Sequence, residues 1–245
     1  MSSGRCEPAT AGSKQNPAAV SAEQSSPPAA AARLAGLGVL VVLVLAYLGA
    51  QIYALSASLE RVRSDDPTVW SEDIAAFASK APGPSGALLF VGSSSIRRWA
   101  DLAEHMAPIP VINRGFGGSK VGDVIYHSET LFQARAPLAV VIFVGTNDIT
   151  PEAAKPLDAL VEAFEEMMGE VRRFHPQTPV YYIAITPSPL RWEVWDKAKA
   201  VNGAISELAR GMANTTVIDT GNALMVDGLP DDANYVFDQL HLSER

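Results

Sequence analysis

Three residue types that together activate a nucleophile occur in two short blocks of the sequence. Ser94 lies in a Gly-Ser-Ser-Ser turn, and Asp238 and His241 lie three residues apart near the end of the chain. A serine hydroxyl is a weak nucleophile until a base removes its proton, and a neutral imidazole is such a base. An aspartate that accepts a hydrogen bond from the second ring nitrogen fixes the required tautomer. We therefore expect Ser94 to attack, His241 to take the proton and Asp238 to orient His241.

Two further blocks carry groups suited to stabilising negative charge. Gly118 lies in a glycine-rich segment at 114–119, and Asn147 lies in Gly145-Thr146-Asn147-Asp148. The tetrahedral intermediate of acyl transfer needs hydrogen-bond donors aimed at its oxyanion. We expect the backbone N–H groups of Ser94 and Gly118 and the side-chain amide of Asn147 to supply them. Glycine at 118 would let a substrate oxygen approach the backbone closely.

Each block has a simpler interpretation when it is taken alone. Serine-rich turns are more often helix caps, and glycines often only satisfy a tight turn. Asn147-Asp148 could cap a helix that begins near residue 152, and Asp238 and His241 could form a surface pair. No Gly-x-Ser-x-Gly elbow surrounds Ser94, because residue 96 is isoleucine. The order of the four blocks along the chain is what favours one shared site.

The first three blocks follow the ends of predicted strands. Short apolar runs bounded by turn residues predict buried strands at 87–91, 111–113, 139–144, 180–185 and 216–218. Apolar residues at three- and four-residue spacing predict helices near 119–135, 152–174 and 194–213. This alternation predicts an α/β fold with a doubly wound, mostly parallel five-stranded sheet and helices on both faces. In such a fold, ligands bind beyond the carboxyl ends of the strands.

The N-terminal third of the chain has a different composition. Residues 1–33 are rich in Ala, Ser, Pro and Gln without apolar periodicity, which predicts a disordered tail. Residues 34–55 form an uncharged apolar run of 22 residues, and about 20 such residues cross a bilayer. We expect a transmembrane signal-anchor helix at 34–56, a stalk and approach segment at 57–85, and a catalytic domain at 86–245.

Two alternatives to the anchor remain open, a cleaved signal peptide and a buried core helix. The apolar run is longer than the usual 7–15 residues of a signal peptide, although a weak cleavage pattern occurs at 54–56. Arg33 lies on one side of the run and Arg61 and Arg63 on the other, so the positive-inside count decides no orientation. We expect a single-pass protein with its catalytic domain outside the cytoplasm, as is usual for one N-terminal anchor. Secretion after signal cleavage is the alternative.

Composition excludes several other classes of function. The net charge is −8 and no basic cluster occurs, so a nucleic-acid partner is not expected. The single cysteine, Cys6, excludes an intramolecular disulfide framework and a cysteine-rich zinc site. The four histidines form no HExxH pair and no close cluster, so no metal is expected. His105, His127 and His175 are expected to be solvated or helix-end residues.

The four blocks together resemble the SGNH hydrolase superfamily, the GDSL-type lipases and esterases, from about Ala87 to Ser243. The family blocks Gly-Asp-Ser, Asn-to-Gly, Gly-x-Asn-Asp and Asp-x-x-His resemble Gly92-Ser93-Ser94, Asn113 to Gly118, Gly145–Asp148 and Asp238–His241. The resemblance implies a three-layer, flavodoxin-like α/β/α fold, no cofactor, and hydrolysis of an ester or thioester.

The chain departs from the family pattern in two places. Ser93 replaces the family's aspartate, so no role of that aspartate is carried over. The sequence also ends four residues after His241, where relatives usually continue into a terminal helix, so we expect that helix to be missing.

Three functions are compatible with the sequence. The first is an esterase that acts on a small acyl ester, an acylated glycan or a lysophospholipid. The second is an acyltransferase that passes the same acyl group to a glycan. The third is a non-catalytic, membrane-tethered binding protein with a decayed site.

Overall fold

The structure is a computed structural model that describes residues 29–151 and 155–244. Most of the predicted tail at 1–33, Cys6 included, lies outside the described residues. The chain divides into two compact units, residues 1–53 and 54–245. Within the first unit, the described residues from 29 onwards are helical.

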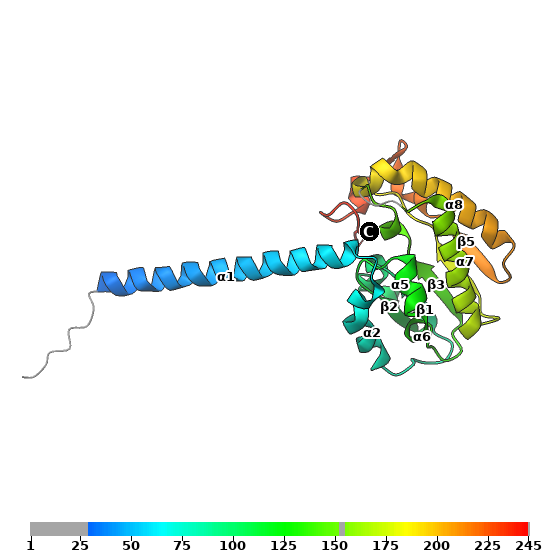
Figure 1. Ribbon diagram of the computed structural model, residues 1–245, viewed down its shortest axis with the longest axis horizontal. Coiled ribbons are helices and arrows are strands. Elements are labelled where there is room, and N and C mark those ends of the chain that lie inside the picture. Colours follow the sequence, from blue (N-terminus) through cyan, green and yellow to red (C-terminus); the bar gives the residue numbers. More distant parts are fainter. Residues whose placement is uncertain (1–28, 152–154, 245) are drawn as a thin grey trace, which may run out of the picture. The chain divides into compact units, whose positions relative to one another are not determined.

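Helix α1 runs from Ala29 to Arg63, seven residues beyond the predicted anchor (Figure 1). It continues because neither glycine nor proline occurs between Gly49 and Pro67. From Gly36 to Arg63 it is long and apolar enough to cross a membrane. None of the side chains described from 36 to 56 is buried, which disagrees with the buried core helix.

The second unit is built on one five-stranded parallel sheet. Its strands are β1 (Leu88–Gly92), β2 (Val111–Gly115), β3 (Ala139–Phe143), β4 (Val180–Ile183) and β5 (Thr215–Ile218). They lie in the order β2-β1-β3-β4-β5, and all neighbours are parallel. The predicted doubly wound α/β fold is confirmed. Because the strand order reverses beside β1, the segments after β1, β2 and β3 meet at the edge where such folds bind ligands.

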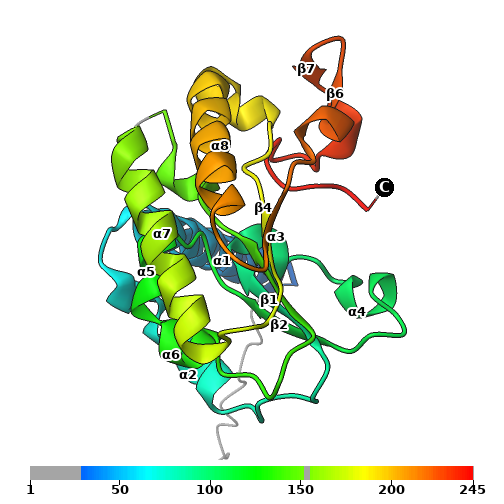
Figure 2. The same ribbon diagram turned by 90° about the vertical axis from the view of Figure 1, so that its right-hand side faces the viewer.

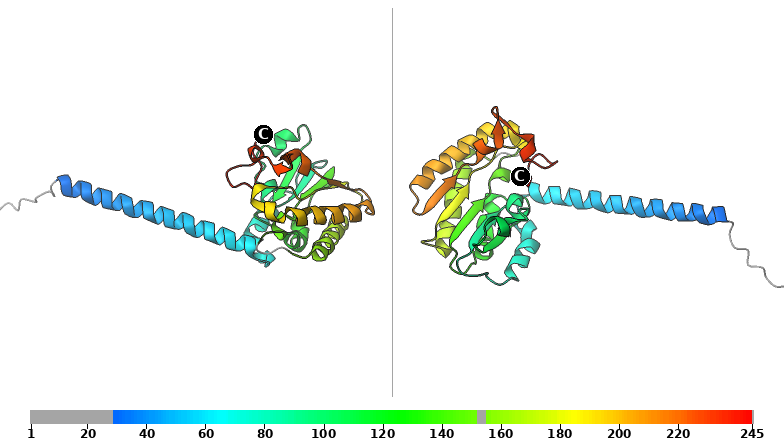
Figure 3. Two further views of the ribbon diagram at one scale, coloured as in Figure 1. Left: turned by 90° about the horizontal axis from the view of Figure 1, so that it is seen from above. Right: turned by 180° about the vertical axis from the view of Figure 1, so that it is seen from behind.

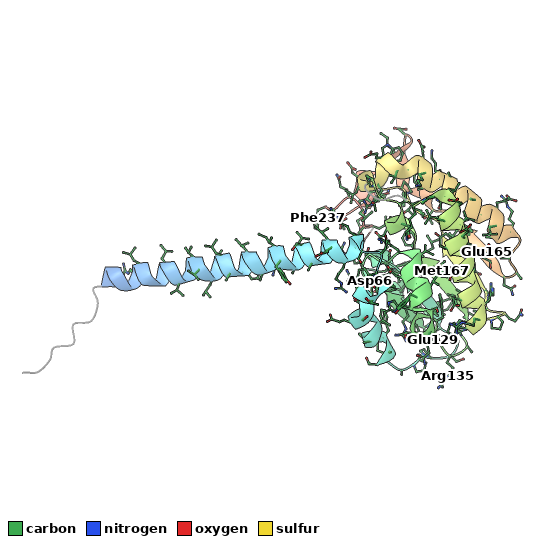
Figure 4. All side chains as sticks on the ribbon, in the orientation of Figure 1. Asp66, Glu129, Arg135, Glu165, Met167 and Phe237 are labelled. Carbon is green, nitrogen blue, oxygen red and sulfur yellow. The ribbon has the colours of Figure 1, made fainter. Side chains whose placement is uncertain are left out.

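One face of the sheet carries the larger hydrophobic core. It is covered by α2 (Ser71–Ala78), α5 (Val121–Tyr126), α6 (Ser128–Leu131), α7 (Leu157–Phe174) and α8 (Trp195–Arg210). Figure 2 shows α5, α7 and α8 side by side on this face. Along α7, Leu160, Phe164 and Met167 recur at helical spacing and are buried, and Figure 4 labels Met167. Helix α7 begins after Pro156, which suits a helix start but not a helix interior.

The other face carries a smaller cluster under two short helices, α3 (Ser94–Arg97) and α4 (Leu102–His105). Phe90, Ile96, Leu102, Val141 and Phe143 form this cluster. Figure 2 shows α3 and α4 across the sheet from α7, which completes the three layers.

The chain after β5 contains short elements only. They are the 3-10 turn Gly221–Leu224, the strands β6 (Met225–Val226) and β7 (Leu229–Pro230), and the 3-10 turn Asp232–Asn234. Strands β6 and β7 form an antiparallel hairpin of their own. Figure 3 shows this segment in two further views, ending in the stretch that carries Asp238 and His241.

Candidate active site

The turn between β1 and α3 presents Ser94. Strand β1 ends at Gly92, and the Ser93 N–H donates to the Phe143 carbonyl at 3.1 Å, which fixes the turn against β3. The Ser93 carbonyl accepts the N–H groups of Ile96 and Arg97, each at 3.1 Å, and so starts the helix. Ser94 is therefore the first helical residue, and its own N–H has no intrahelical acceptor.

The structure brings Ser94, His241 and Asp238 into one chain of hydrogen bonds. His241 Nε2 lies 2.7 Å from Ser94 Oγ, although the two residues are 147 positions apart. His241 Nδ1 lies 2.7 Å from Asp238 Oδ2. The other carboxylate oxygen, Asp238 Oδ1, accepts the backbone N–H groups of Leu240 at 3.1 Å and His241 at 3.0 Å. This is the arrangement in which an imidazole can take the proton of a serine.

Asn147 lies beside Ser94, in the 3-10 turn Thr146–Asp148 that follows β3. Both residues line one small cavity, together with Ser93, Ser95 and Thr146. The Asn147 side-chain nitrogen donates one hydrogen to the Ser119 carbonyl at 3.1 Å, which sets the orientation of the amide. An amide nitrogen carries two hydrogens. Among residues 29–151 and 155–244 the second hydrogen has no acceptor, so it can bind an oxygen atom of a ligand.

Gly118 precedes Ser119, the partner of Asn147. Within the described part of the chain, the backbone N–H groups of Gly118 and Ser94 have no backbone acceptor, as oxyanion donors require. Gly118 is not among the residues that line the small cavity of Ser94 and Asn147. A Cβ at position 118 would lie 2.6 Å from Val62 Cγ2. Close packing against α1 is thus a second reason for glycine here, beyond the approach of a substrate.

The environment keeps the base neutral and the acid ionised. Burial lowers the pKa of His241, and the charge of Arg98 lowers it further, although the hydrogen bond to Asp238 acts in the opposite direction. Burial alone would raise the pKa of Asp238. The hydrogen bonds from His241, Leu240 and Arg98 outweigh that effect and hold the pKa of Asp238 well below its ordinary value. At neutral pH the imidazole is therefore ready to accept a proton.

The sequence from residue 78 to 245 matches the GDSL-like Lipase/Acylhydrolase family. The protein belongs to this family. As a GDSL-like acylhydrolase it is an esterase, and its five-stranded parallel sheet flanked by helices is the fold of that family. No curated protein matches the sequence.

This acylhydrolase is similar to several solved structures, and each of the three matches below covers most of the length of the solved protein. A Streptococcus pneumoniae protein matches with a TM-score of 0.62 and 19% identity, covering 82% of this chain and 92% of that protein. A GDSL-like lipase from Bacteroides thetaiotaomicron matches with a TM-score of 0.56, 18% identity and coverages of 73% and 90%. A family 3 carbohydrate esterase from Clostridium thermocellum matches with a TM-score of 0.52, 14% identity and coverages of 66% and 89%. At these identities the similarity establishes the fold alone.

Arg98 is a residue of this candidate site that the sequence did not predict. Its Nη1 lies 2.9 Å from Asp238 Oδ2 and 2.7 Å from His241 Nδ1. A guanidinium only donates hydrogen bonds, so Arg98 and His241 share the same carboxylate oxygen. The spacing from Ser94 to Arg98 is four residues, which places two side chains on one face of a helical turn. That spacing was the signal available in the sequence.

Replacing Arg98 with glutamine is expected to shift the acid limb of the pH profile of kcat/KM to higher pH. Loss of the nearby positive charge raises the pKa of His241, so the imidazole becomes protonated, and useless as a base, at a higher pH than in the wild type. The measurement is kcat/KM on a soluble ester from pH 4 to 9, with Arg210→Gln as a control at an exposed arginine that pairs with Glu207. An unchanged acid limb in Arg98→Gln would contradict this role.

A cleft of about 370 Å³ opens next to His241. Most of its lining surface is apolar, with contributions from Ile96, Trp99, Phe143, Ile183, Leu224 and Leu242, although polar and charged residues also line it. Phe143 and Thr186 also line the small cavity of Ser94, so the two spaces adjoin. Most ligand sites combine an apolar lining with a few polar groups in this way. The cleft can therefore hold an apolar part of a ligand next to His241.

The remaining histidines have structural partners. His127 and His175 lie at helix ends and are buried, and their Nε2 atoms lie 2.8 Å and 2.7 Å from the carbonyl oxygens of Pro67 and Phe132. His105 is exposed and accepts a hydrogen bond from the Trp99 indole at 2.8 Å. Among residues 29–151 and 155–244, no group of three His, Cys, Asp or Glu side chains is arranged to hold a metal ion.

Proposed function

We propose that this acylhydrolase is a membrane-anchored serine esterase with Ser94 as nucleophile, His241 as general base and Asp238 as its orienting acid. The observation that carries the proposal is the continuous hydrogen-bonded chain from Ser94 through His241 to Asp238. The residues come from opposite ends of the domain, and each distance is that of a strong hydrogen bond. A surface pair of Asp238 and His241 would need no serine at the second imidazole nitrogen.

The proposed reaction proceeds through an acyl-enzyme. Ser94 Oγ attacks the ester carbonyl carbon while its proton moves to His241 Nε2, and the carbonyl oxygen becomes an oxyanion. The N–H groups of Ser94 and Gly118 and the Asn147 amide stabilise that oxyanion. The carbon–oxygen bond of the leaving alcohol then breaks, and the alcohol takes the proton from His241. Water, deprotonated by His241, attacks the acyl-enzyme in the same manner and releases the carboxylic acid and free Ser94.

The apolar cleft supports a substrate with a hydrocarbon acyl chain. A dry apolar cavity of about 150 Å³ holds a benzene molecule, and the cleft beside His241 is more than twice that volume at about 370 Å³. An acyl chain of medium length, as in a lysophospholipid or another simple acyl ester, would bury its surface there. An acetyl group on a glycan would leave most of the apolar lining uncovered.

The test is a series of p-nitrophenyl esters with acyl chains of two to twelve carbons, assayed with the full chain in detergent. We expect kcat/KM to increase from acetate to a medium chain and then to level off or fall. The matched variant is Ala223→Trp, because Ala223 lines the cleft, is exposed and is not a member of the triad. It should lower activity on medium chains about tenfold or more and leave acetate hydrolysis nearly unchanged. Acetate as the best substrate of the wild type would contradict the acyl-chain assignment.

The anchor is the remaining element of the proposal. Helix α1 offers one apolar segment of sufficient length from Gly36 onwards, and its described side chains up to 56 are exposed. We propose a single-pass protein whose catalytic domain lies outside the cytoplasm. Recovery of the intact chain in carbonate-washed membranes would support the anchor, and its digestion by a protease added outside intact cells would support the proposed side. Release of a chain that begins near residue 57 would show a cleaved signal instead.

A further inference from the structure

The last turn of α1 packs against the segment that carries Gly118. Val62 occupies the space in which a side chain at position 118 would lie. Both residues belong to the same compact unit, residues 54–245. Val62 lies outside the part of the chain that matches the GDSL-like family, which begins at residue 78. This contact involves a residue that precedes the family match, and it touches the segment proposed to bind the oxyanion.

Lys120, which follows Gly118 closely in the sequence, forms hydrogen bonds to the end of α1. Its Nζ donates to the carbonyl of Arg63 at 3.2 Å, to the carbonyl of Ser64 at 2.8 Å and to Asp65 Oδ1 at 2.8 Å. The side chain of Lys120 is only 10% exposed, while that of Asp65 is 75% exposed. The final carbonyls of a helix have no partner within the helix. Lys120 therefore supplies the C-terminal cap of α1 from a position two residues after Gly118.

The backbone N–H groups of Lys120 and Val121 are also hydrogen-bonded, in each case to a buried carboxylate. Asp123 Oδ2 accepts the Lys120 N–H at 2.8 Å and the Trp70 indole N–H at 3.1 Å. Asp148 Oδ2 accepts the Val121 N–H at 3.0 Å, and Asp148 directly follows Asn147. The hydrogen bonds thus connect the end of α1, the Gly118 segment and the Asn147 turn.

Lys155 is a second cation that joins this network, because it lies near both Asp148 and Asp65. Lys155 Nζ lies 2.9 Å from Asp148 Oδ1 and 3.8 Å from Asp65 Oδ1. Burial would lower the pKa of Lys155, but the charges of Asp148 and Asp65 outweigh it and raise the pKa. Asp65, at the end of α1, thus faces both Lys120 and Lys155.

We propose that Lys120 is a positioning residue that holds the end of α1 against Gly118 and thereby sets the place of the oxyanion donors. The proposal rests on the proposed function, which assigns those donors to Gly118 and Asn147. Without Lys120, the final carbonyls of α1 lose their partner, and the contact between Val62 and Gly118 loosens. A displacement of about 1 Å at a reacting group is enough to lower the rate about 100-fold.

The test compares full-length variants in detergent with a p-nitrophenyl ester as substrate. Lys120→Met is expected to lower kcat by about 10- to 100-fold, with KM for the ester and the acid limb of the pH profile unchanged, since neither the cleft nor His241 is touched. Lys120→Arg, which keeps a cation that donates to carbonyl oxygens, should restore most of kcat. Lys199→Met is the matched control, because Lys199 is exposed and pairs with Asp196 on α8, away from Gly118 in the sequence.

A purely structural role would lower the midpoint of thermal unfolding and leave kcat of the folded protein unchanged, and that result would overturn the proposal. Because Lys120→Met removes a buried charge and could prevent folding, Val62→Ala provides the second measurement. This variant removes the methyl groups nearest Gly118 from a half-buried side chain and should fold. We expect it to lower kcat about fivefold at unchanged KM. Wild-type kcat in Val62→Ala would also overturn the proposal, whereas a wild type without esterase activity would overturn the proposed function itself.

Discussion

Ser94→Ala should reduce kcat/KM for ester hydrolysis by about 10⁴-fold or more, because no acyl-enzyme can form without the hydroxyl. His241→Ala should reduce it by a similar amount. The double variant should be no worse than either single variant, because residues of one catalytic unit do not act additively. The measurement is the rate of p-nitrophenyl butyrate hydrolysis by the full chain, with the far-ultraviolet circular dichroism of each variant as a check on folding.

Ser95→Ala is the matched control for the nucleophile. Ser95 is the next residue along α3 and is half-buried like Ser94, yet only Ser94 Oγ lies within hydrogen-bond distance of His241 Nε2. The control should keep activity within a few-fold of the wild type. A Ser94→Ala protein that remains active, or a Ser95→Ala protein that is inactive, would contradict the assignment.

Asn147→Ala is the substitution with the second largest expected effect, a loss of about 10²- to 10³-fold in kcat at nearly constant KM. The amide hydrogen that does not bind Ser119 is the one we assign to the oxyanion, and an oxyanion exists only along the reaction path. The loss should therefore appear in kcat rather than in substrate binding.

Asn147→Asp tests whether the amide acts as a hydrogen-bond donor. Aspartate has nearly the same size, but it replaces the donor with a negative charge, so it should be at least as slow as Asn147→Ala. Both variants are to be compared by steady-state kinetics on the same ester. A kcat within threefold of the wild type in Asn147→Ala would remove Asn147 from the oxyanion site.

The strands were the most predictable part of the fold. Val140, Ile142 and their neighbours in β3 are buried on both faces of the sheet, and such strands are continuous apolar runs that sequence alone reveals. The lateral order β2-β1-β3-β4-β5 could not be predicted in the same way. It depends on contacts between strands distant in sequence, which periodicity does not contain.

The edge of the sheet at which Ser94 and Asn147 lie was predictable, because both follow the ends of parallel strands. Asp238 and His241 follow no strand of this sheet, and their place beside Ser94 was expected from residue type, their three-residue spacing and the order of the four blocks. The surroundings of these residues were less accessible. The simpler interpretation of Asn147-Asp148 was a cap on the helix that follows, yet Asp148 is 1% exposed and accepts the Val121 N–H at the start of α5. A buried charge is recognised only when its partner is known, and here the partners lie in other elements.

The hydrogen bonds between the end of α1 and the Gly118 segment could not be predicted from the sequence either, because their partners lie in different elements. Lys120 reads as an ordinary surface lysine in the sequence, and its three acceptors lie 55 to 57 positions away. The length of α1 was also underestimated, because the charges at Glu60, Arg61 and Arg63 end the apolar run without ending the helix. Charged residues favour helix as much as many apolar ones do.

The most direct test of the central claim is to label the full-length protein with a fluorophosphonate probe and locate the adduct by peptide mass spectrometry. This probe reacts with a serine whose hydroxyl is activated by a base. The account predicts one adduct, on Ser94, that forms in the wild type and is lost in His241→Ala. Absence of labelling in the folded wild type, or an adduct on any other serine, would contradict it.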